Sequence, residues 1–242
     1  MEAPSAGRAV ILALGMVLGG WLVGQGFVNA RTVDRYVTVK GVAERVVTAD
    51  IGLWPLRFVA TDDVLAAAQT RLESQRRTVM AFLRRNGIDS TMTELQGLEV
   101  VDTRANAYGG NNTSSRFILS MSIMVRSEDP ARIQAISQRV GELVDAGVVL
   151  SSGGGGFGAG PTFLFTRLND LKPEMIAEAT ASARKAAEQF ARDSKSSLAG
   201  IRRANQGVFE ILPRDQAPGI METTQIQKTL RVVTTVDYLL RN

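Results

Sequence analysis

The stretch Phe117–Val125, FILSMSIMV, decides the fold class of this chain. Large apolar residues alternate along it with smaller or polar ones. Successive side chains of a β-strand point to opposite faces, so the alternation predicts a strand with one buried face. The buried face is predicted to hold Phe117, Leu119, Met121, Ile123 and Val125, and the other face Ser120, Ser122 and Met124.

Three helices and further strands are predicted on both sides of this stretch. Acidic residues or proline at the start and glycine at or just past the end place helices at 62–85 and 130–147, and Asn169, Asp170 and Pro173 begin a third that includes Phe190. The other strands are predicted at 36–44, 46–59, 93–103, 162–168, 202–212 and 229–240. The order is β-β-α-β-β-α-β-α-β-β. Hairpins between helices favour an α+β domain with a mostly antiparallel sheet and helices packed on one face.

Each of the three predicted helices has an apolar stripe, and in the second it is predicted to hold Ile133, Ile136, Val140 and Leu143. In the first, the stripe is predicted to hold Leu65, Leu72, Val79, Phe82 and Leu83. In the third, the inward residues are predicted to be Ile176, Ala179, Ala183, Ala187 and Phe190. So many alanines indicate a close approach to the sheet or to a neighbouring helix.

An uncharged segment, Ala9–Ala30, precedes the domain. A helix of this length rises about 33 Å, enough to cross the hydrocarbon core of a membrane. A cleaved signal peptide, leaving after Val28-Asn29-Ala30, and an uncleaved anchor both fit, and we favour the anchor. The predicted organisation is a tail at 1–8, the membrane segment at 9–30, a linker at 31–35 and one domain at 36–242. The anchor residues are predicted to be Val10, Leu14 and Trp21, with Gly15, Gly19, Gly20 and Gly24 on two small-residue faces.

The charges beside this segment conflict with export of the domain. Arg8 precedes the segment, whereas Arg31, Arg35, Lys40 and Arg45 follow it. Positively charged flanks stay in the cytoplasm, so this count alone would leave the domain there. We set the count aside only because of the family resemblance given below.

The composition excludes several kinds of chemistry. The chain has no cysteine and no histidine, which removes the usual zinc ligands, the thiol nucleophile and the imidazole base of a serine hydrolase. Its 28 basic and 24 acidic residues alternate, and no basic stripe is interleaved with aromatic residues, so nucleic-acid binding is not expected. The chain is predicted to be no enzyme and to hold no metal or cofactor.

Several short motifs match functional patterns without their context. Gly153, Gly155 and Gly158 have the spacing of a dinucleotide fingerprint, but an extended stretch rather than a helix follows. Ser182 and Lys185 have the Ser-x-x-Lys spacing of acyl enzymes but lie mid-helix without partner motifs. Paired-carboxylate catalysis by Glu94, Glu99 and Asp102 needs a geometry that the sequence does not supply. The loops at 104–115 and 153–160 are candidate contact surfaces, represented by Tyr108, Asn111, Gly154 and Phe157.

The whole pattern resembles the SIMPL-domain family. The resemblance covers roughly Tyr36 to Leu240. It rests on Val37-Thr38-Val39-Lys40-Gly41 with Ala43-Glu44, the helix end at Asn86-Gly87-Ile88, the strand Phe117–Val125, the helix with Ala179, Ala183 and Ala187, and the last strand from Val232 to Tyr238. The family resemblance implies a bacterial envelope protein with an antiparallel sheet backed by helices. It offers no established catalytic residues.

The resemblance also implies a role in assembly. Some members are periplasmic immunogenic proteins that form homo-oligomeric rings or channel-like particles, and others are linked to resistance to oxidative stress. Two features depart from the family, namely the glycine-rich insert at 153–160 and the anchor-like segment. We therefore expect a non-enzymatic homo-oligomer tethered to the cytoplasmic membrane, with its domain in the periplasm. The alternative is an exported binding module for a small molecule, a peptide or an envelope partner.

Overall fold

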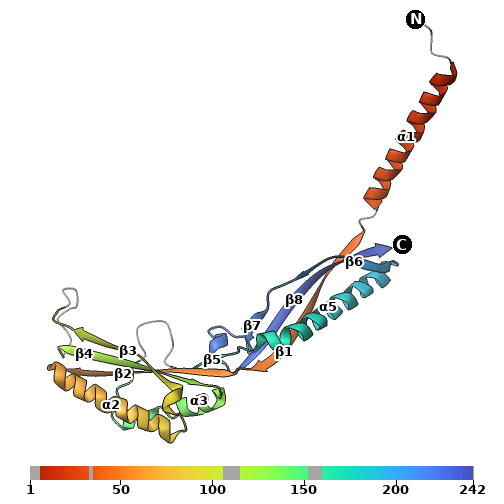
Figure 1. Cartoon of the computed structure of the whole chain (residues 1–242). Helices are drawn as coiled ribbons and strands as arrows, with labels where there is room; N and C mark the ends of the chain where they lie inside the picture. Colours follow the sequence, from red (N-terminus) through yellow and green to blue (C-terminus); the bar gives the residue numbers. More distant parts are fainter. Residues whose placement is uncertain (1–5, 33–34, 106–114, 152–159, 242) are drawn as a thin grey trace. The chain divides into compact units, whose positions relative to one another are not determined.

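The computed structural model describes residues 6–32, 35–105, 115–151 and 160–241 (Figure 1). It confirms the α+β class and the antiparallel strands. The α-helices are α1 (Ala6–Thr32), α2 (Leu65–Arg85), α3 (Pro130–Ser137), α4 (Gly141–Asp145) and α5 (Leu168–Asp193). The strands are β1 (Tyr36–Thr48), β2 (Ile51–Asp62), β3 (Thr93–Asp102), β4 (Phe117–Ser127), β5 (Thr162–Leu164), β6 (Ser197–Gln206), β7 (Glu210–Pro213) and β8 (Gln227–Arg241). Two short 3-10 helices are η1 (Ser90–Met92) and η2 (Glu222–Thr224).

The strands form two sheets where the sequence predicted one. In sheet A the order is β1-β8-β6, with β7 also paired to β8, and in sheet B it is β3-β4-β2-β5. The chain divides into two compact units, one made of residues 1–43, 174–209 and 232–242 and the other of 44–173 and 210–231. We call these the first unit and the second unit.

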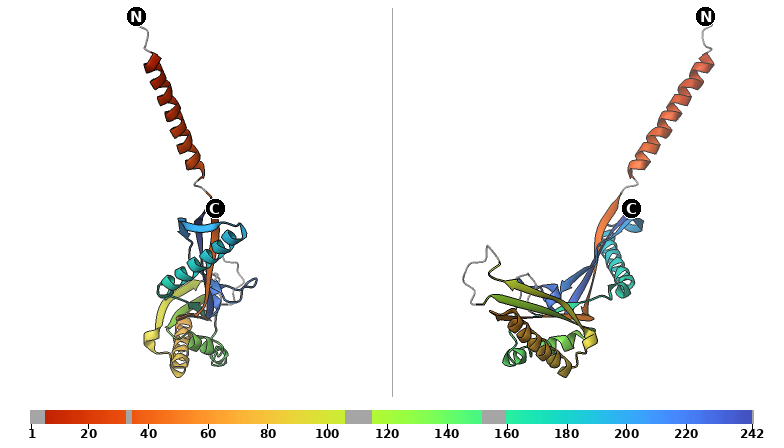
Figure 2. Two further views of the ribbon diagram at one scale, coloured as in Figure 1. Left: turned by 90° about the vertical axis from the view of Figure 1, so that its right-hand side faces the viewer. Right: turned by 60° about the vertical axis from the view of Figure 1, so that its left-hand side comes forward.

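The second unit has its core on one face of sheet B. Every other residue of β2 is buried, and in β4 Leu119, Met121, Ile123 and Val125 are buried as the alternation predicts, whereas Phe117 is half-buried and Ser120 of the other face is also buried. Helices α2 and α3 cover this face, as both views of Figure 2 show. The core contains, among others, Trp54, Leu56, Phe58 and Ala60 of β2, Leu119, Met121, Ile123 and Val125 of β4, and Leu72, Val79, Phe82 and Leu83 of α2.

The first unit is built around α5, which packs on sheet A. The buried residues of the helix recur every four positions and are mostly alanines. A Cβ added to Gly41 of β1 would lie 1.9 Å from the carbonyl oxygen of Ala179, so the helix backbone lies directly on the strand. This confirms the close approach that the alanines predict. The buried stripe is Met175, Ala179, Ala183, Ala187 and Ala191.

Two predicted core residues are exposed instead. Phe190 of α5 is 59% exposed, and Leu65 of α2 is 43% exposed. The buried stripe of α5 advances by four residues a step, so Ala191 takes the inward position and Phe190 falls beside it. In α2, Leu65 is the first helical residue, whereas Ala68 is the first one that reaches the core.

Several boundaries also differ from prediction. The helix predicted at 130–147 divides at 138–140. There the hydrogen bonds from Arg139 N to Ile136 O and from Val140 N to Ser137 O join residues three positions apart, whereas an α-helix joins residues four positions apart. The strand predicted at 202–212 divides into β6 and β7 at Gly207. There a Cβ would meet Val233 O at 2.5 Å, so the backbones approach too closely for a side chain.

The predicted apolar segment forms α1, but its membrane role needs correction. Within the described residues, no helix has both the length and the apolar character needed to span a bilayer. Its glycines, among them Gly15, Gly19, Gly20 and Gly24, have no side chains. They therefore contribute little apolar surface. The predicted anchor residues all lie on α1, and Val10, Leu14 and Trp21 are exposed there together with Gly15, Gly19, Gly20 and Gly24.

Candidate functional site

Sheet B has one edge that the chain itself covers. The short strand β5 pairs with the start of β2, from Ile51 to Leu53. Further along, Val59 N donates to Val149 O at 2.8 Å and Ser151 N donates to Arg57 O at 2.9 Å. Helix η2 in turn lies against β5. This side of β2 is therefore protected against pairing with another strand.

The other edge of sheet B is β3, which the described residues leave open. Within the described residues, β3 pairs only with β4. Leu95, Leu98 and Val100 lie opposite Ile123, Met121 and Leu119, on the face that α2 covers elsewhere. They are nevertheless 58%, 53% and 50% exposed. We call the open backbone of β3 with these three side chains the β3 edge.

The β3 edge carries features that limit indiscriminate pairing. The register with β4 shifts between Leu95 and Gly97, which leaves Gln96 as an extra residue in the strand. Glu94 and Glu99 place carboxylates along the same strand. Bulges and charges on an edge strand disfavour random association, so only a partner that matches the shift and the charges can add to it.

The face of sheet B opposite the helices carries a polar network. Arg57 Nη2 of β2 donates to Glu99 Oε2 at 2.7 Å and to Ser120 Oγ at 3.0 Å. Ser120 Oγ also lies 3.2 Å from Glu99 Oε2, to which it donates. The three groups border an open depression of about 190 Å³ that is also lined by Gln96, Gly97, Leu98 and Ser122.

One end of the β3 and β4 pair is held by charges. Arg116 Nη2 donates to Asp102 Oδ2 at 3.0 Å, and its guanidinium carbon lies 4.8 Å from the ring centre of Phe117. The backbone N–H of Arg116 donates to Asp63 at 3.0 Å. The hydrogen bond from Arg116 lowers the pKa of the Asp102 carboxyl below its usual range, and the same bond raises the pKa of Arg116.

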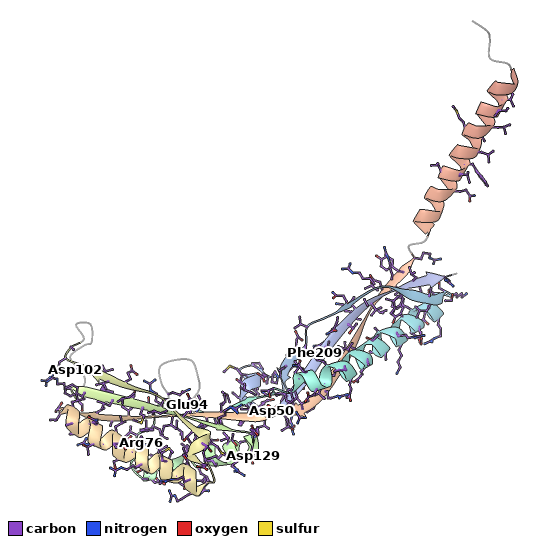
Figure 3. The ribbon with its side chains drawn as sticks, in the orientation of Figure 1. Asp50, Arg76, Glu94, Asp102, Asp129 and Phe209 are labelled. Carbon is purple, nitrogen blue, oxygen red and sulfur yellow. The ribbon has the colours of Figure 1, made fainter. Side chains whose placement is uncertain are left out.

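The three carboxylates considered for catalysis do not converge. Glu94 lies opposite Met124 and Glu99 opposite Ser120, whereas Asp102 lies opposite Phe117, on the other face of the strand. Figure 3 shows Glu94 and Asp102 at opposite ends of β3. Paired-carboxylate chemistry needs two such groups within a few ångströms of one substrate bond. This arrangement does not provide that pairing.

The remaining sequence motifs are also placed by the structure. Ser182 and Lys185 lie on α5, where Ser182 is half-buried and Lys185 exposed. The glycine run leads into β5 rather than into a helix, so the dinucleotide interpretation lacks its structural context. Across the described ranges, no group of three or more acidic side chains is arranged to hold a metal ion. The predicted contact residues Tyr108, Asn111, Gly154 and Phe157 lie outside the described residues.

The sequence did not single out the β3 edge, although a signal was present. The stretch was predicted as a strand, and Leu95 and Leu98 are three residues apart, whereas Leu98 and Val100 are two apart. A strict strand would place apolar residues two apart, so the spacing of three around Gly97 marks the bulge. The sequence does not show how far the helices extend over the sheet, so it could not predict that Leu95 and Leu98 are exposed.

Comparison with known proteins gives one family. A family model named SIMPL, described as a protein of unknown function (DUF541), matches residues 37–238. No curated protein matches the chain. The matched region includes all strands of both sheets apart from the first residue of β1 and the last three of β8. The chain therefore belongs to the SIMPL family.

Proposed function

We propose that this protein is an exported, non-enzymatic module of the bacterial envelope that assembles with further copies of itself through the β3 edge. The single observation that carries the proposal is the open edge strand with three apolar side chains at least half exposed. Adding a strand to such an edge satisfies backbone N–H and C=O groups and buries apolar surface at once.

The contrast between the two edges of sheet B supports this choice. The β2 side is covered by β5 and by the Val149–Ser151 segment. The β3 side has no such cover within the part of the chain that the structure describes. A chain that protects one edge and leaves the other open has a single direction in which its sheet can grow. The missing histidine and cysteine, counted over the whole sequence, agree with a role without catalysis.

The alternative function, capture of a small molecule, a peptide or an envelope partner, has less support. The depression beside Arg57 is a polar feature that Gln96, Gly97, Leu98 and Glu99 of β3 help to line. Its charged groups already satisfy one another, because Arg57, Glu99 and Ser120 are mutually hydrogen-bonded. A ligand would have to replace these bonds rather than fill an unmet requirement.

Light scattering on the purified full-length chain in mild detergent tests the assembly. We expect a homo-oligomer for the wild type and a large shift toward monomer for the double variant Leu98→Lys/Val100→Lys, because lysine on an edge strand opposes pairing. The control is Val144→Lys/Val208→Lys, which places two lysines at exposed valines outside β3. A monomeric wild type, or equal dissociation of both variants, would refute the proposal.

The same pair of variants addresses stress tolerance, which the family resemblance implies. In a bacterial strain that depends on this gene, we expect cells with Leu98→Lys/Val100→Lys to survive oxidant exposure less well than cells with the control variant. Equal survival at equal protein level would separate assembly from any role in stress. Export has its own test, since a fusion after Asn242 to a reporter active only outside the cytoplasm should be active.

A further inference from the structure

One end of sheet A gathers four chain segments of the first unit. Leu240 N donates to Arg35 O at 2.8 Å, which ties the start of β1 to the end of β8. Ser197, the first residue of β6, pairs with Arg241. Ser196 N donates to Ala191 O at 2.9 Å, so the last turn of α5 lies at the same end.

This end is rich in exposed basic side chains. The basic residues are Arg35, Arg192, Lys195, Arg202 and Arg241, which together we call the basic end. All five are exposed. Among the described residues of this end, Asp193 carries a carboxylate, and it accepts a hydrogen bond from Gln189 at 2.9 Å. Several like charges on one end create a positive potential that attracts an extended negative partner.

Apolar and aromatic side chains lie among these charges. Phe190 is 59% exposed and Ile201 is 54% exposed. Tyr36 is 46% exposed, and the guanidinium carbon of Arg202 lies 4.4 Å from the centre of its ring. A surface that combines lysine and arginine with exposed phenylalanine and isoleucine matches the boundary between lipid headgroups and acyl chains.

We propose that the basic end binds the surface of an anionic phospholipid membrane. The charges would contact phosphate headgroups while Phe190 and Ile201 enter the headgroup layer. A nucleic acid fits less well, because the Tyr36 ring is already occupied by Arg202 and the other exposed aromatic here, Phe190, stands without a row of stacking partners among the described residues. In the sequence, α1 with its exposed apolar residues ends at Thr32, three positions before Arg35.

Vesicle cosedimentation of the full-length chain tests this surface. Neutral phosphatidylcholine vesicles measure any binding through α1, and vesicles with about one third phosphatidylglycerol measure the added electrostatic binding. We expect the affinity for the anionic vesicles to exceed that for the neutral ones, and the excess to vanish in about 0.5 M salt. The triple variant Arg192→Glu/Lys195→Glu/Arg241→Glu should lose about a hundredfold in affinity for the anionic vesicles.

A matched control separates the basic end from net charge. The triple variant Arg77→Glu/Arg84→Glu/Arg85→Glu reverses three exposed arginines of α2 and changes the total charge by the same amount. It should bind anionic vesicles within about threefold of the wild type, since these charges lie outside the proposed surface. Equal loss in both triple variants, or no loss in the first, would overturn the proposal. Tighter salt-sensitive binding to RNA than to the anionic vesicles, lost in the first variant, would also overturn it.

Discussion

At the scale of single residues, Gly41 has the least room for a side chain among the described glycines. A Cβ there would lie 1.9 Å from Ala179 O, 2.4 Å from Ala183 N and 2.8 Å from Ala183 Cβ. Two of these atoms are backbone of α5, which cannot move without displacing the helix. The helix can lie this close to the strand only because Gly41 has no side chain and the facing residues of α5 are alanines.

Gly41→Ala should therefore destabilise the protein by about 3 kcal/mol or more, the cost of a severe overpacking defect. Urea unfolding of the purified variant measures this loss. Gly200→Ala serves as the control, because Gly200 also lies in sheet A and a Cβ there meets no atom within 4 Å. The control should change the free energy of unfolding by less than about 0.5 kcal/mol. Equal effects of the two substitutions would contradict the packing argument.

Lys228 is a second residue whose role depends on its surroundings. Its side chain is fully buried, and its Nζ donates to Glu222 O at 2.7 Å and forms an ion pair with the Glu222 carboxylate. The Glu222 side chain is 26% exposed. Removing the carboxylate would leave a buried ammonium with one carbonyl for a partner, whereas removing the lysine would leave a carboxylate that can reach water.

We expect Glu222→Ala to cost about 2 kcal/mol, below the full value for a buried pair because water screens the exposed part of Glu222. Lys228→Met keeps most of the side-chain volume and should cost clearly less than Glu222→Ala. Chemical unfolding of both variants and of the double variant gives the coupling between the two positions. The account fails if Lys228→Met is the more damaging of the two single changes.

At the scale of whole elements, a sequence pattern predicts an element well when the signal lies within that element. The alternation from Phe117 to Val125 is complete within one strand, so it predicted the buried face of β4 correctly. The prediction for Phe190 was wrong because the sequence does not show whether residue 190 or residue 191 of the helix faces the sheet. The contact of Ala179 and Ala183 with Gly41 fixes which side of α5 is buried. The number of sheets and the open β3 edge depend on long-range pairing, which one sequence pattern does not encode.

The start of α3 shows a local signal that can be measured. Asp129 precedes Pro130, and its Oδ1 accepts a hydrogen bond from Arg132 N at 3.1 Å. Asp129→Ala should therefore destabilise the protein by about 1 kcal/mol in urea unfolding. Asp129→Asn keeps an oxygen that can accept the bond and should recover most of that loss. If both variants lose the same stability, the loss comes from the charge of Asp129, which also pairs with the Arg132 guanidinium, and not from the capping hydrogen bond.

At the scale of the whole molecule, the two proposed surfaces belong to different units of the chain. The β3 edge lies in the second unit, and the basic end lies in the first. Substitutions on one surface should therefore leave the other intact, because the two surfaces share no residue. The intrinsic affinity of each subunit of Leu98→Lys/Val100→Lys for anionic vesicles should equal that of the wild type. Its apparent affinity should fall only by the avidity that is lost with the oligomer.

The absence of histidine gives the whole molecule a simple dependence on pH near neutrality. Histidine is the side chain whose ordinary pKa lies between 5 and 8, and this chain has none. The folded and unfolded states should therefore bind nearly the same number of protons between about pH 6 and pH 8. We expect the urea midpoint to stay constant across this range. A midpoint that changes steadily there would reveal a titrating group with a strongly shifted pKa.

In acid the same molecule should lose stability, for reasons set by three ion pairs. Hydrogen bonds from Arg76, Arg116 and Arg214 lower the pKa of Glu73, Asp102 and Asp215 in the folded state. A carboxyl whose folded pKa lies below its unfolded value stabilises the fold above the unfolded pKa, and this contribution disappears as the pH falls through the folded pKa. The urea midpoint should therefore decline below about pH 4.

Asp102→Asn isolates one of these contributions, because the amide does not titrate. The variant should be less stable than the wild type at pH 7, and the two should converge as the pH falls, since the wild type loses in acid what the variant has already lost. Glu94→Gln, at the other end of β3, is the control, because the structure shows no ion pair or side-chain hydrogen bond for Glu94 among the described residues. Its loss of stability at pH 7 should be smaller than that of Asp102→Asn. If the difference in stability between Asp102→Asn and the wild type does not change with pH, the ion pair with Arg116 does not cause the loss of stability in acid.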